Sequence, residues 1–358
     1  MELYYQHGGV TIYNTDAAQL YPQFEDGAFG LLFLDPPYYK VKRDKWDWQW
    51  DTPAQYLEWL GKHADQWRRI LAPNGSLYVC ASPQMAWNVE GVLRERFEVL
   101  SRVTWEKRDN GGNGQHKKQG PEKFRAYFPD YEVIFFCEQR GADSWAMGEN
   151  GYNAKCDELR GFVFEPLRAY LDGERERAGL RIGDMNLICG TTFNQRNTNC
   201  VKIQWQMITE ERYSALQKAC KGFFTREYED LRREYEDLRR EYEDLRRPFN
   251  GTTERPFTSV WHYATVQAYN GKHPCEKPYE MLRDIIETSS RPDMLCADFF
   301  AGSGVFGAAC RDLGRHVVLC EQSEHWARAA QQRVMGPPLL RLMRADDEPQ
   351  QQTLLELQ

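Results

Sequence analysis

The chain has 358 residues, of which 41% are hydrophobic and 13% aromatic, so it can bury a sizeable core and, at roughly 150 residues per domain, form about two domains. Its apolar runs are far shorter than the ~20 residues of a membrane span and no leader pattern is recognisable, so we expect a cytoplasmic protein without a membrane partner. Its ten cysteines show neither CxxC pairs nor zinc spacing, so we expect reduced thiols and no metal. The net charge of −7 argues only weakly against a nucleic-acid partner, because residues 101–125 hold seven Lys/Arg against three Asp/Glu.

Residues 1–140 alternate between strand-like and helix-like patterns. Residues 29–34, for example, form a short apolar run typical of a buried strand, whereas residues 56–71 carry apolar residues at helical spacing. This alternation predicts an α/β fold with a doubly wound, mostly parallel sheet covered on both faces. The expected strands are 9–16, 29–34, 76–81, 97–107 and 131–138, and the expected helices are 56–71 and 85–97.

Between residues 141 and 255 the alternation breaks down, and the composition becomes rich in Gly, Asn, Thr and Arg. We interpret this segment as a separate module inserted into the α/β domain. Several of its polar side chains could contact base edges or phosphates, although polar residues are common in any loop. These are Asn194, Gln195, Arg196, Asn197 and Lys202.

The inserted module contains a tandem repeat, REYEDLR, three times between residues 226 and 246. Its Tyr and Leu residues alternate at steps of three and four, which is the spacing of a heptad seam. Each repeat also places a Glu four residues before an Arg, the favoured order for ion pairs on a helix. The pattern predicts a helix over 226–247 that ends before Pro248. We interpret it as a surface helix lengthened by duplication, with a coiled-coil dimer contact or a DNA contact as alternatives.

The α/β alternation resumes in residues 256–335. We expect this part to continue the sheet that residues 1–140 begin. A polar, Gln-rich end at 336–358 predicts a loosely ordered tail. The expected strands are 294–300 and 316–321, and the expected helices are 278–290, 305–314 and 323–334.

The first candidate site is the sequence DPPY at the end of the apolar run FGLLFL. Pro36 and Pro37 cannot continue a central strand, because proline lacks the N–H that a ladder needs. They fix a turn in which the Asp35 carboxylate and the Pro36 carbonyl can accept hydrogens from one exocyclic amine, while Tyr38 offers a ring for stacking an extruded base. The tetrapeptide alone more often marks only a turn. At the end of a buried α/β strand, however, it lies where doubly wound folds bind ligands.

The second candidate site is the loop AGSG, between a predicted strand and a predicted helix. Gly302 and Gly304 allow a tight turn and the close approach of a ligand. The loop is neither a GxGxxG motif nor a phosphate loop, since no lysine follows it. Glu321, at the end of the next strand, can accept hydrogen bonds from both hydroxyls of a ribose. The loop and the acid together predict a site for a nucleoside whose other end is an amino acid.

A third motif, KHPCEKPYEML, lies just before the predicted helix 278–290. Lys277 in this motif could pair with a carboxylate. An ordinary proline-terminated loop explains the motif equally well.

These motifs resemble those of the S-adenosylmethionine-dependent amino-methyltransferases of DNA. The family writes its cofactor loop as Asp-Pro-Phe-x-Gly-Ser-Gly, usually followed by two threonines. Here Phe299 replaces the proline and Val305-Phe306 replace the threonines, so the hydroxyl contacts of those threonines are lost. The motifs that carry the resemblance are DPPY, Asp298-Phe299-Phe300 before AGSG, Glu321, and HPCEKP.

The order of the motifs resembles the permuted beta class, in which a target-recognition domain lies between a catalytic half and a cofactor half. The resemblance covers roughly residues 1–140 and 256–335, and it implies a Rossmann-like methyltransferase fold with the recognition domain at 141–255. It also implies S-adenosylmethionine as cofactor, double-stranded DNA as partner and a possible homodimer. A stand-alone methyltransferase and the partner of a restriction nuclease would carry the same motifs.

The resemblance further implies roles for individual residues. Asp35 to Tyr38 would be the catalytic motif. Asp16, at the end of the first strand, would lie near the cofactor adenine, although an Asp there is often only a turn residue. Glu321 would hold the ribose. The remaining residues expected around the cofactor are Lys277 and Asp298, with Phe300, Gly302 and Gly304 lining the methionine pocket.

Several activities remain open after this comparison of motifs. In the family an Asp as first motif residue favours adenine N6, whereas Ser favours cytosine N4, so we predict a DNA adenine-N6 methyltransferase with a cytosine-N4 enzyme as the alternative. RNA and protein-glutamine methyltransferases also use a (D/N)PPY turn, but they usually place the cofactor loop before it. A non-catalytic DNA-binding protein would not need all the motifs.

Overall fold

The computed structural model describes residues 3–41, 45–107, 125, 127, 129–140, 163–190, 207–252 and 258–338. The chain divides into two compact units, the first formed by Met1–Ala142 and Pro248–Gln358 and the second by Asp143–Arg247. The polar residues from 194 to 202, the centre of the basic loop and the tail from 339 lie outside the described residues. No helix in the described ranges is long and apolar enough to cross a membrane.

The second boundary between the units lies before Pro248, earlier in the chain than the boundary expected at residue 255. The reason is that residues just after the repeat are attached to the sheet-containing unit. The backbone N–H of Asn250 donates to the carbonyl of Thr288 at 2.8 Å. The ring of Phe249 stacks on that of Phe136, with centroids 5.7 Å apart.

In its described residues, the first unit is built on a nine-stranded sheet in the order β1-β2-β9-β8-β3-β4-β6-β5-β7. Strands β2, β9, β8, β3 and β4 are paired in parallel, which confirms the mostly parallel sheet. The edge strands β1 and β7 were not predicted. The strands are β1 Leu3–His7, β2 Val10–Tyr13, β3 Phe29–Leu34, β4 Leu71–Ala81, β5 Phe97–Glu106, β6 Tyr131–Gln139, β7 Val260–His262, β8 Leu295–Asp298 and β9 His316–Cys320.

Strand β6 lies antiparallel between β4 and β5, a pairing that strand propensity alone did not predict. The chain leaves β5 at Glu106 and returns at its register partner Tyr131. Because β6 runs against its neighbours, its first residues lie at the same edge of the sheet as the last residues of β3, β4 and β5. This edge carries the site described below.

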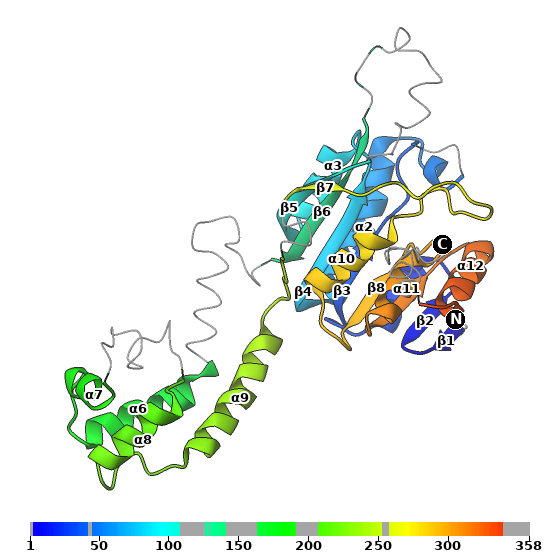
Figure 1. Ribbon diagram of the computed structural model, residues 1–358. Coiled ribbons are helices and arrows are strands. Elements are labelled where there is room, and N and C mark those ends of the chain that lie inside the picture. Colours follow the sequence, from blue (N-terminus) through cyan, green and yellow to red (C-terminus); the bar gives the residue numbers. More distant parts are fainter. Residues whose placement is uncertain are drawn as a thin grey trace, which may run out of the picture. The chain divides into compact units, whose positions relative to one another are not determined.

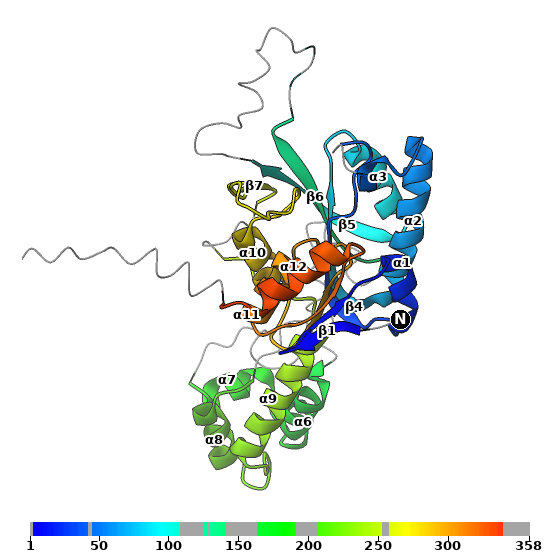
Figure 2. The same cartoon turned by 90° about the vertical axis from the view of Figure 1, so that its right-hand side faces the viewer.

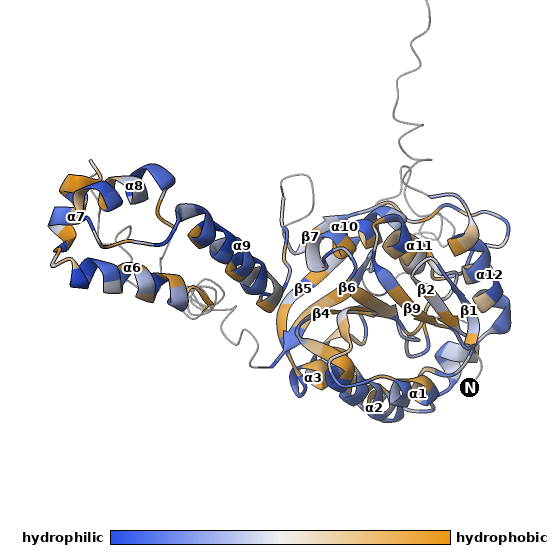
Figure 3. Cartoon of the chain, turned by 90° about the horizontal axis from the view of Figure 1, so that it is seen from below, coloured by the Kyte–Doolittle hydropathy of each residue, from blue (hydrophilic) through white to orange (hydrophobic). Residues whose placement is uncertain are grey.

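Helices cover both faces of the sheet, with α1, α2 and α3 on one face and α10, α11 and α12 on the other (Figures 1 and 2). Figure 3 shows that the central strands carry mostly hydrophobic residues, whereas the helices around them also carry many hydrophilic residues. In β3, Leu32 and Leu34 pack into one core while Leu31 and Phe33 pack into the other, which explains the continuous apolar run. The helices are α1 Ala17–Leu20, α2 Pro53–Ile70, α3 Ala86–Arg94, α10 Tyr279–Ser289, α11 Val305–Asp312 and α12 Glu324–Met335.

The described part of the second unit is helical and has its own hydrophobic core. Within this core the buried carboxylate of Glu174 accepts a hydrogen bond from the backbone N–H of Phe224 at 2.6 Å. The helices are α6 Glu165–Arg177, α7 Ile182–Ile188, α8 Glu210–Ala219 and α9 Tyr228–Leu245.

The repeat forms helix α9, and its seam packs inside the second unit. Leu231 is fully buried, Tyr242 is nearly so, and the ring of Tyr235 stacks on Phe164 with centroids 5.3 Å apart. Leu245, which occupies the position of Leu231 two repeats later, is 44% exposed. Most of the seam packs against other residues of the same unit and so does not need a second chain to cover it. This supports the surface-helix interpretation over the coiled-coil alternative.

The ion pairs along α9 differ in spacing from those expected. Arg232 pairs with Glu229 at 3.7 Å and Arg233 with Asp230 at 3.5 Å, so the pairs join residues three apart instead of four. All four side chains are more than half exposed, and such pairs stabilise a helix by only about 0.5 kcal/mol or less.

Candidate active site

A cavity of about 1310 Å³ opens at the carboxyl edge of the sheet in the first unit. It lies where doubly wound folds bind ligands, and it joins the DPPY turn after β3 to the glycine loop after β8. Motifs from opposite ends of the chain therefore line one cavity. Among the residues predicted from the sequence, the cavity is lined by Asp16, Asp35, Pro36, Pro37, Tyr38, Lys277, Phe300, Gly302 and Glu321.

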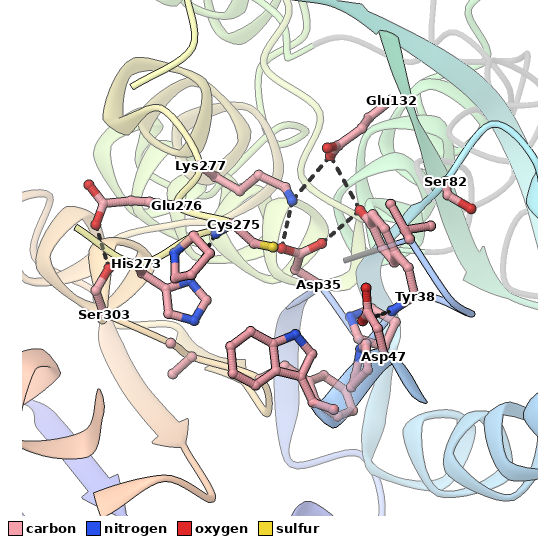
Figure 4. Close-up of a pocket in the computed structure, with 18 of the residues that line it drawn as sticks. Asp35, Tyr38, Asp47, Ser82, Glu132, His273, Cys275, Glu276, Lys277 and Ser303 are labelled. Carbon is pink, nitrogen blue, oxygen red and sulfur yellow. Dashed lines mark hydrogen bonds and ion pairs between the residues drawn. The ribbon is translucent and has the colours of Figure 1, made fainter. Parts of the chain in front are cut away.

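The DPPY turn is held by hydrogen bonds within and beyond the motif (Figure 4). The hydroxyl of Tyr38 donates to Asp35 Oδ1 at 2.8 Å. The backbone N–H of Tyr38 donates to the buried carboxylate of Asp47, also at 2.8 Å. Burial and the neighbouring carboxylates of Asp35 and Glu132 raise the pKa of Tyr38 well above its usual value. Tyr38 is therefore a neutral hydrogen-bond donor that fixes Asp35.

Lys277 has a carboxylate partner within the protein. Its Nζ lies 2.6 Å from Asp35 Oδ2 and 3.1 Å from Glu132 Oε2, and the side chain is only 6% exposed. Burial lowers the pKa of Lys277, but the two carboxylates outweigh it and raise the pKa well above its usual value. The motif before α10 thus brings a permanent cation to Asp35. The sequence suggested that Lys277 could pair with a carboxylate, but it did not say which one.

Glu132 and Lys107 belong to this cluster, and the sequence did not single them out. Lys107 Nζ lies 2.5 Å from Glu132 Oε1, and Glu132 Oε2 lies 3.3 Å from the Tyr38 hydroxyl. Burial raises the pKa of Glu132, but Lys277 and Lys107 outweigh it and lower the pKa to about 2. The one available signal was an acid at the start of an apolar strand, which by itself is unremarkable.

The glycine loop is tied to the acid at the end of β9. The N–H of Gly302 donates to Glu321 Oε2 at 2.8 Å, and the N–H of Ser323 donates to Glu321 Oε1 at 2.8 Å. Gly302 has a φ of +50°, and a Cβ there would approach the His273 ring within 3.1 to 3.3 Å. Burial raises the pKa of Glu321, although the backbone N–H donors oppose the shift.

Asp298 and Gly304 do not line the cavity, but they stabilise the glycine loop. Gly304 has a φ of +75°, and a Cβ there would lie 2.7 Å from the Cβ of Ala330 in α12, so glycine permits close helix packing. Asp298 Oδ1 accepts the N–H of Phe300 at 2.9 Å. Burial raises the pKa of Asp298 to about 8, against the effect of that hydrogen bond.

Aromatic rings line the cavity between Asp16 and the glycine loop. The ring of Trp59 lies 4.3 Å from that of His63 and 6.0 Å from that of Phe300, measured between centroids. His63 Nδ1 is hydrogen-bonded to the Tyr21 hydroxyl at 2.9 Å, and burial lowers the pKa of His63 to about 4. Asp16 caps α1 by accepting the N–H of the second helical residue at 2.7 Å.

The segment before Lys277 is fastened across the glycine loop. Glu276 accepts hydrogen bonds from Ser303 at 2.6 Å, from Tyr269 at 2.8 Å and from Arg333 at 2.8 Å. These contacts connect the segment before α10, the glycine loop and α12. They hold the backbone that places Lys277 opposite Asp35.

The fold and this cavity define an α/β protein with a nucleoside-type site beside an acid turn suited to an amine. The model of the N6/N4 DNA methylase family matches residues 29–332, which is more than half of the chain. The chain therefore belongs to this family.

Individual relatives match to different extents. Type II methyltransferase M1.MboII of Moraxella bovis is 28% identical over 317 residues, which cover 86% of this chain and 90% of that protein. Type II methyltransferase M2.MboI of Moraxella bovis is 26% identical over 111 residues, which cover 27% of this chain and only 40% of that protein. The structure of PvuII DNA methyltransferase (cytosine-N4-specific) has a TM-score of 0.50 at 12% identity and covers 94% of this chain and 90% of its own. That likeness concerns the fold.

The cofactor of this family is S-adenosylmethionine, and the cavity fits it. Glu321 presents a carboxylate whose oxygens each keep a lone pair for a ribose hydroxyl beside the backbone N–H that they accept. Trp59 and Phe300 offer apolar ring surface for a purine. The volume exceeds the roughly 300–1,000 Å³ of usual small-molecule sites, which leaves room for a second ligand next to the cofactor.

Proposed function

We propose that the protein transfers a methyl group to the N6 amine of an adenine flipped out of double-stranded DNA. The observation that carries this proposal is the position of Asp35 in the same cavity as Gly302 and Glu321. The reaction requires the acid that orients the amine to lie next to the loop that binds the nucleoside of the methyl donor. The choice of adenine rests on Asp as the first residue of the turn, by resemblance to the family.

Asp35 would act by orienting the amine and stabilising positive charge. Its two oxygens already accept from Tyr38 and Lys277, and each oxygen retains a lone pair for an amine hydrogen. The Pro36 carbonyl would accept the second hydrogen. When bound, S-adenosylmethionine would supply an electrophilic methyl group: the N–C bond would form as the S–C bond breaks, S-adenosylhomocysteine would be the leaving group, and the proton lost by the nitrogen would pass to solvent. The carboxylate favours the positive nitrogen that develops during attack.

The base must leave the DNA stack for its amine to reach Asp35. Tyr38 and the wall formed by Trp46 and His273, whose ring centroids are 6.2 Å apart, offer aromatic surface for the extruded base. We assign target recognition to the second unit together with the basic segment after β5. The support for the second unit is that none of its described residues lines the cavity. The support for the segment after β5 is the excess of seven Lys/Arg over three Asp/Glu in residues 101–125.

Cytosine-N4 methylation is the second candidate. It is favoured by the similarity of the fold to that of PvuII DNA methyltransferase, whose name gives it this specificity. A cytosine amine presents the same two hydrogens to Asp35 and Pro36, so the described acceptors serve either base.

Transfer of labelled methyl groups to unmethylated DNA, followed by nucleoside analysis, tests the proposal. We expect N6-methyladenine in the product. N4-methylcytosine would replace the adenine proposal with the cytosine one, and no label in any DNA would refute both.

The substitution Asp35→Ala tests the assigned role of the turn. We expect the single-turnover rate to fall at least ~10²-fold, because one pre-organised charge at the reacting atom is removed. Cofactor affinity, measured by calorimetry, should stay within about threefold, since Asp35 is assigned to the amine; a loss of binding would contradict this role. Asp51→Ala is the matched control, because its side chain is exposed and outside the cavity.

A further inference from the structure

Four charged side chains form one cluster around the DPPY turn, in which Lys277 is buried and the other three are partly buried (Figure 4 labels three of its members). Lys277 lies between Asp35 and Glu132, at 2.6 and 3.1 Å, and Lys107 contacts the other oxygen of Glu132 at 2.5 Å. The side chains of Asp35 and Glu132 are each 14% exposed. Two carboxylates and two ammonium groups balance, so the cluster is formally neutral.

The reversed direction of β6 places Glu132 in this cluster. Glu132 is the second residue of β6 and pairs in register with Trp105 near the end of β5. If β6 ran parallel to its neighbours, this residue would lie at the opposite edge of the sheet. The antiparallel direction of β6 therefore places Glu132 at the same edge of the sheet as the DPPY turn.

We infer that Glu132 is a positioning residue that holds Lys277 against Asp35 and offsets the charge of Lys277 at the methyl-accepting amine. This inference rests on the proposed function. Glu132 would act through Lys277, whose ammonium group lies 3.1 Å from Glu132 and 2.6 Å from Asp35.

Charge compensation is the physical reason for the second acid. Lys277 fixes the Asp35 carboxylate, but its positive charge also opposes the positive charge that develops on the attacking nitrogen. A carboxylate on the far side of the same ammonium cancels much of this repulsion, because opposite charges a few ångströms apart interact strongly in a low-dielectric site. Lys277 can then orient the Asp35 carboxylate without reducing the stabilisation that this carboxylate gives to the positive nitrogen.

A proton relay through Glu132 is the competing explanation. A hydrogen-bonded path does run from Asp35 through the Tyr38 hydroxyl to Glu132. The two lysines keep Glu132 ionised, however, with its pKa lowered to about 2 in spite of burial. A carboxylate this weak as a base is a poor proton acceptor, so the geometry favours a fixed charge over a relay.

The test is a double-substitution cycle with Glu132→Gln, Lys277→Met and the pair together. Glu132→Gln keeps the shape of the side chain and removes its charge. We expect its single-turnover methyl-transfer rate to fall roughly tenfold, the equivalent of about one pKa unit of lost charge compensation. Affinity for S-adenosylhomocysteine should stay within about twofold, which also shows that the variant is folded.

The cycle then distinguishes an effect of Glu132 that runs through Lys277 from an effect of Glu132 that is independent of Lys277. If Glu132 acts through Lys277, the paired variant should be no slower than Lys277→Met by more than about twofold. Losses that multiply in the paired variant would overturn the inference, as would a Glu132→Gln rate within twofold of the wild type.

Two further variants keep the result interpretable. Glu132→Asp retains the charge and should recover the rate to within about threefold of the wild type; an Asp variant as slow as the Gln variant would contradict charge compensation. Glu25→Gln, at an exposed position, is the matched control. An inert wild type would refute the proposed function, and with it this inference, whereas an active wild type with an equally active Glu132→Gln variant would refute the inference alone.

Discussion

At the scale of single residues, the buried acid behind the glycine loop has a different role from the one its motif suggested. Asp298 is 4% exposed and accepts the N–H of Phe300. This bond fixes the turn that carries Phe300 and Gly302 into the cavity. An acid in this position shapes the loop and need not touch the ligand.

The raised pKa of Asp298 makes stability depend on pH. Its pKa is about 8 when folded and near 3.9 when unfolded, so between these values the native state holds a proton that the unfolded state has lost. Stability contributed by the neutral acid is therefore present at low pH and is lost as the pH rises from about 4 to 8.

Asp298→Asn should remove this pH dependence, because the amide is neutral throughout and its oxygen can still accept the Phe300 N–H. Relative to the wild type, the variant should gain at least ~2 kcal/mol in the free energy of unfolding between pH 5 and pH 8, measured by urea denaturation. Asp51→Asn, an exposed control, should show no such trend. An unchanged difference between the two pH values would mean that native Asp298 is ionised.

At the scale of elements, equivalent residues of the three repeats in helix α9 differ in how deeply they are buried. Leu231, Leu238 and Leu245 hold the same position in successive repeats. The first is fully buried, the second partly buried and the third 44% exposed. The packing of the second unit, and not the repeat itself, determines which copy matters for stability.

The substitutions Leu231→Ala and Leu245→Ala make a matched pair on this helix. Loss of the buried side chain should destabilise the second unit by about 2–5 kcal/mol, whereas loss of the exposed one should cost less than about 1 kcal/mol. Thermal unfolding monitored by circular dichroism measures both. Equal costs that also depend on protein concentration would instead support a dimer seam.

At the scale of the whole molecule, the cavity is built by one of the two units. Every described residue that lines the cavity belongs to the first unit, which is formed by the two ends of the sequence. The second unit has a separate core and lies between them in the chain. If the second unit is the recognition module, as we propose, it could change in sequence without altering the cavity.

Replacing residues 143–247 by a short Gly/Ser linker tests this division. The shortened protein should keep its affinity for S-adenosylhomocysteine within about threefold, because the cavity and its supporting helices remain. Its affinity for duplex DNA, measured by fluorescence anisotropy, should fall at least ~10-fold if the second unit supplies recognition. Undiminished DNA affinity would refute the recognition role.

Local patterns in the sequence were enough to predict much of this architecture. Buried strands, amphipathic helices and proline or glycine turns each leave a short-range signature, so the α/β class, the helix over the repeat and the order of the motifs could be read directly. The DPPY turn and the glycine loop were found because each needs unusual backbone geometry.

Only the tertiary structure decided which of these residues meet. Lys277 is the partner of Asp35, Glu132 joins them because β6 is antiparallel, and Gly304 serves helix packing instead of the cavity. None of these contacts has a local signature, since strand order and the packing of distant helices set them. The sequence by itself determined the elements and the chemical groups, and the long-range pairing of strands determined which charges surround Asp35.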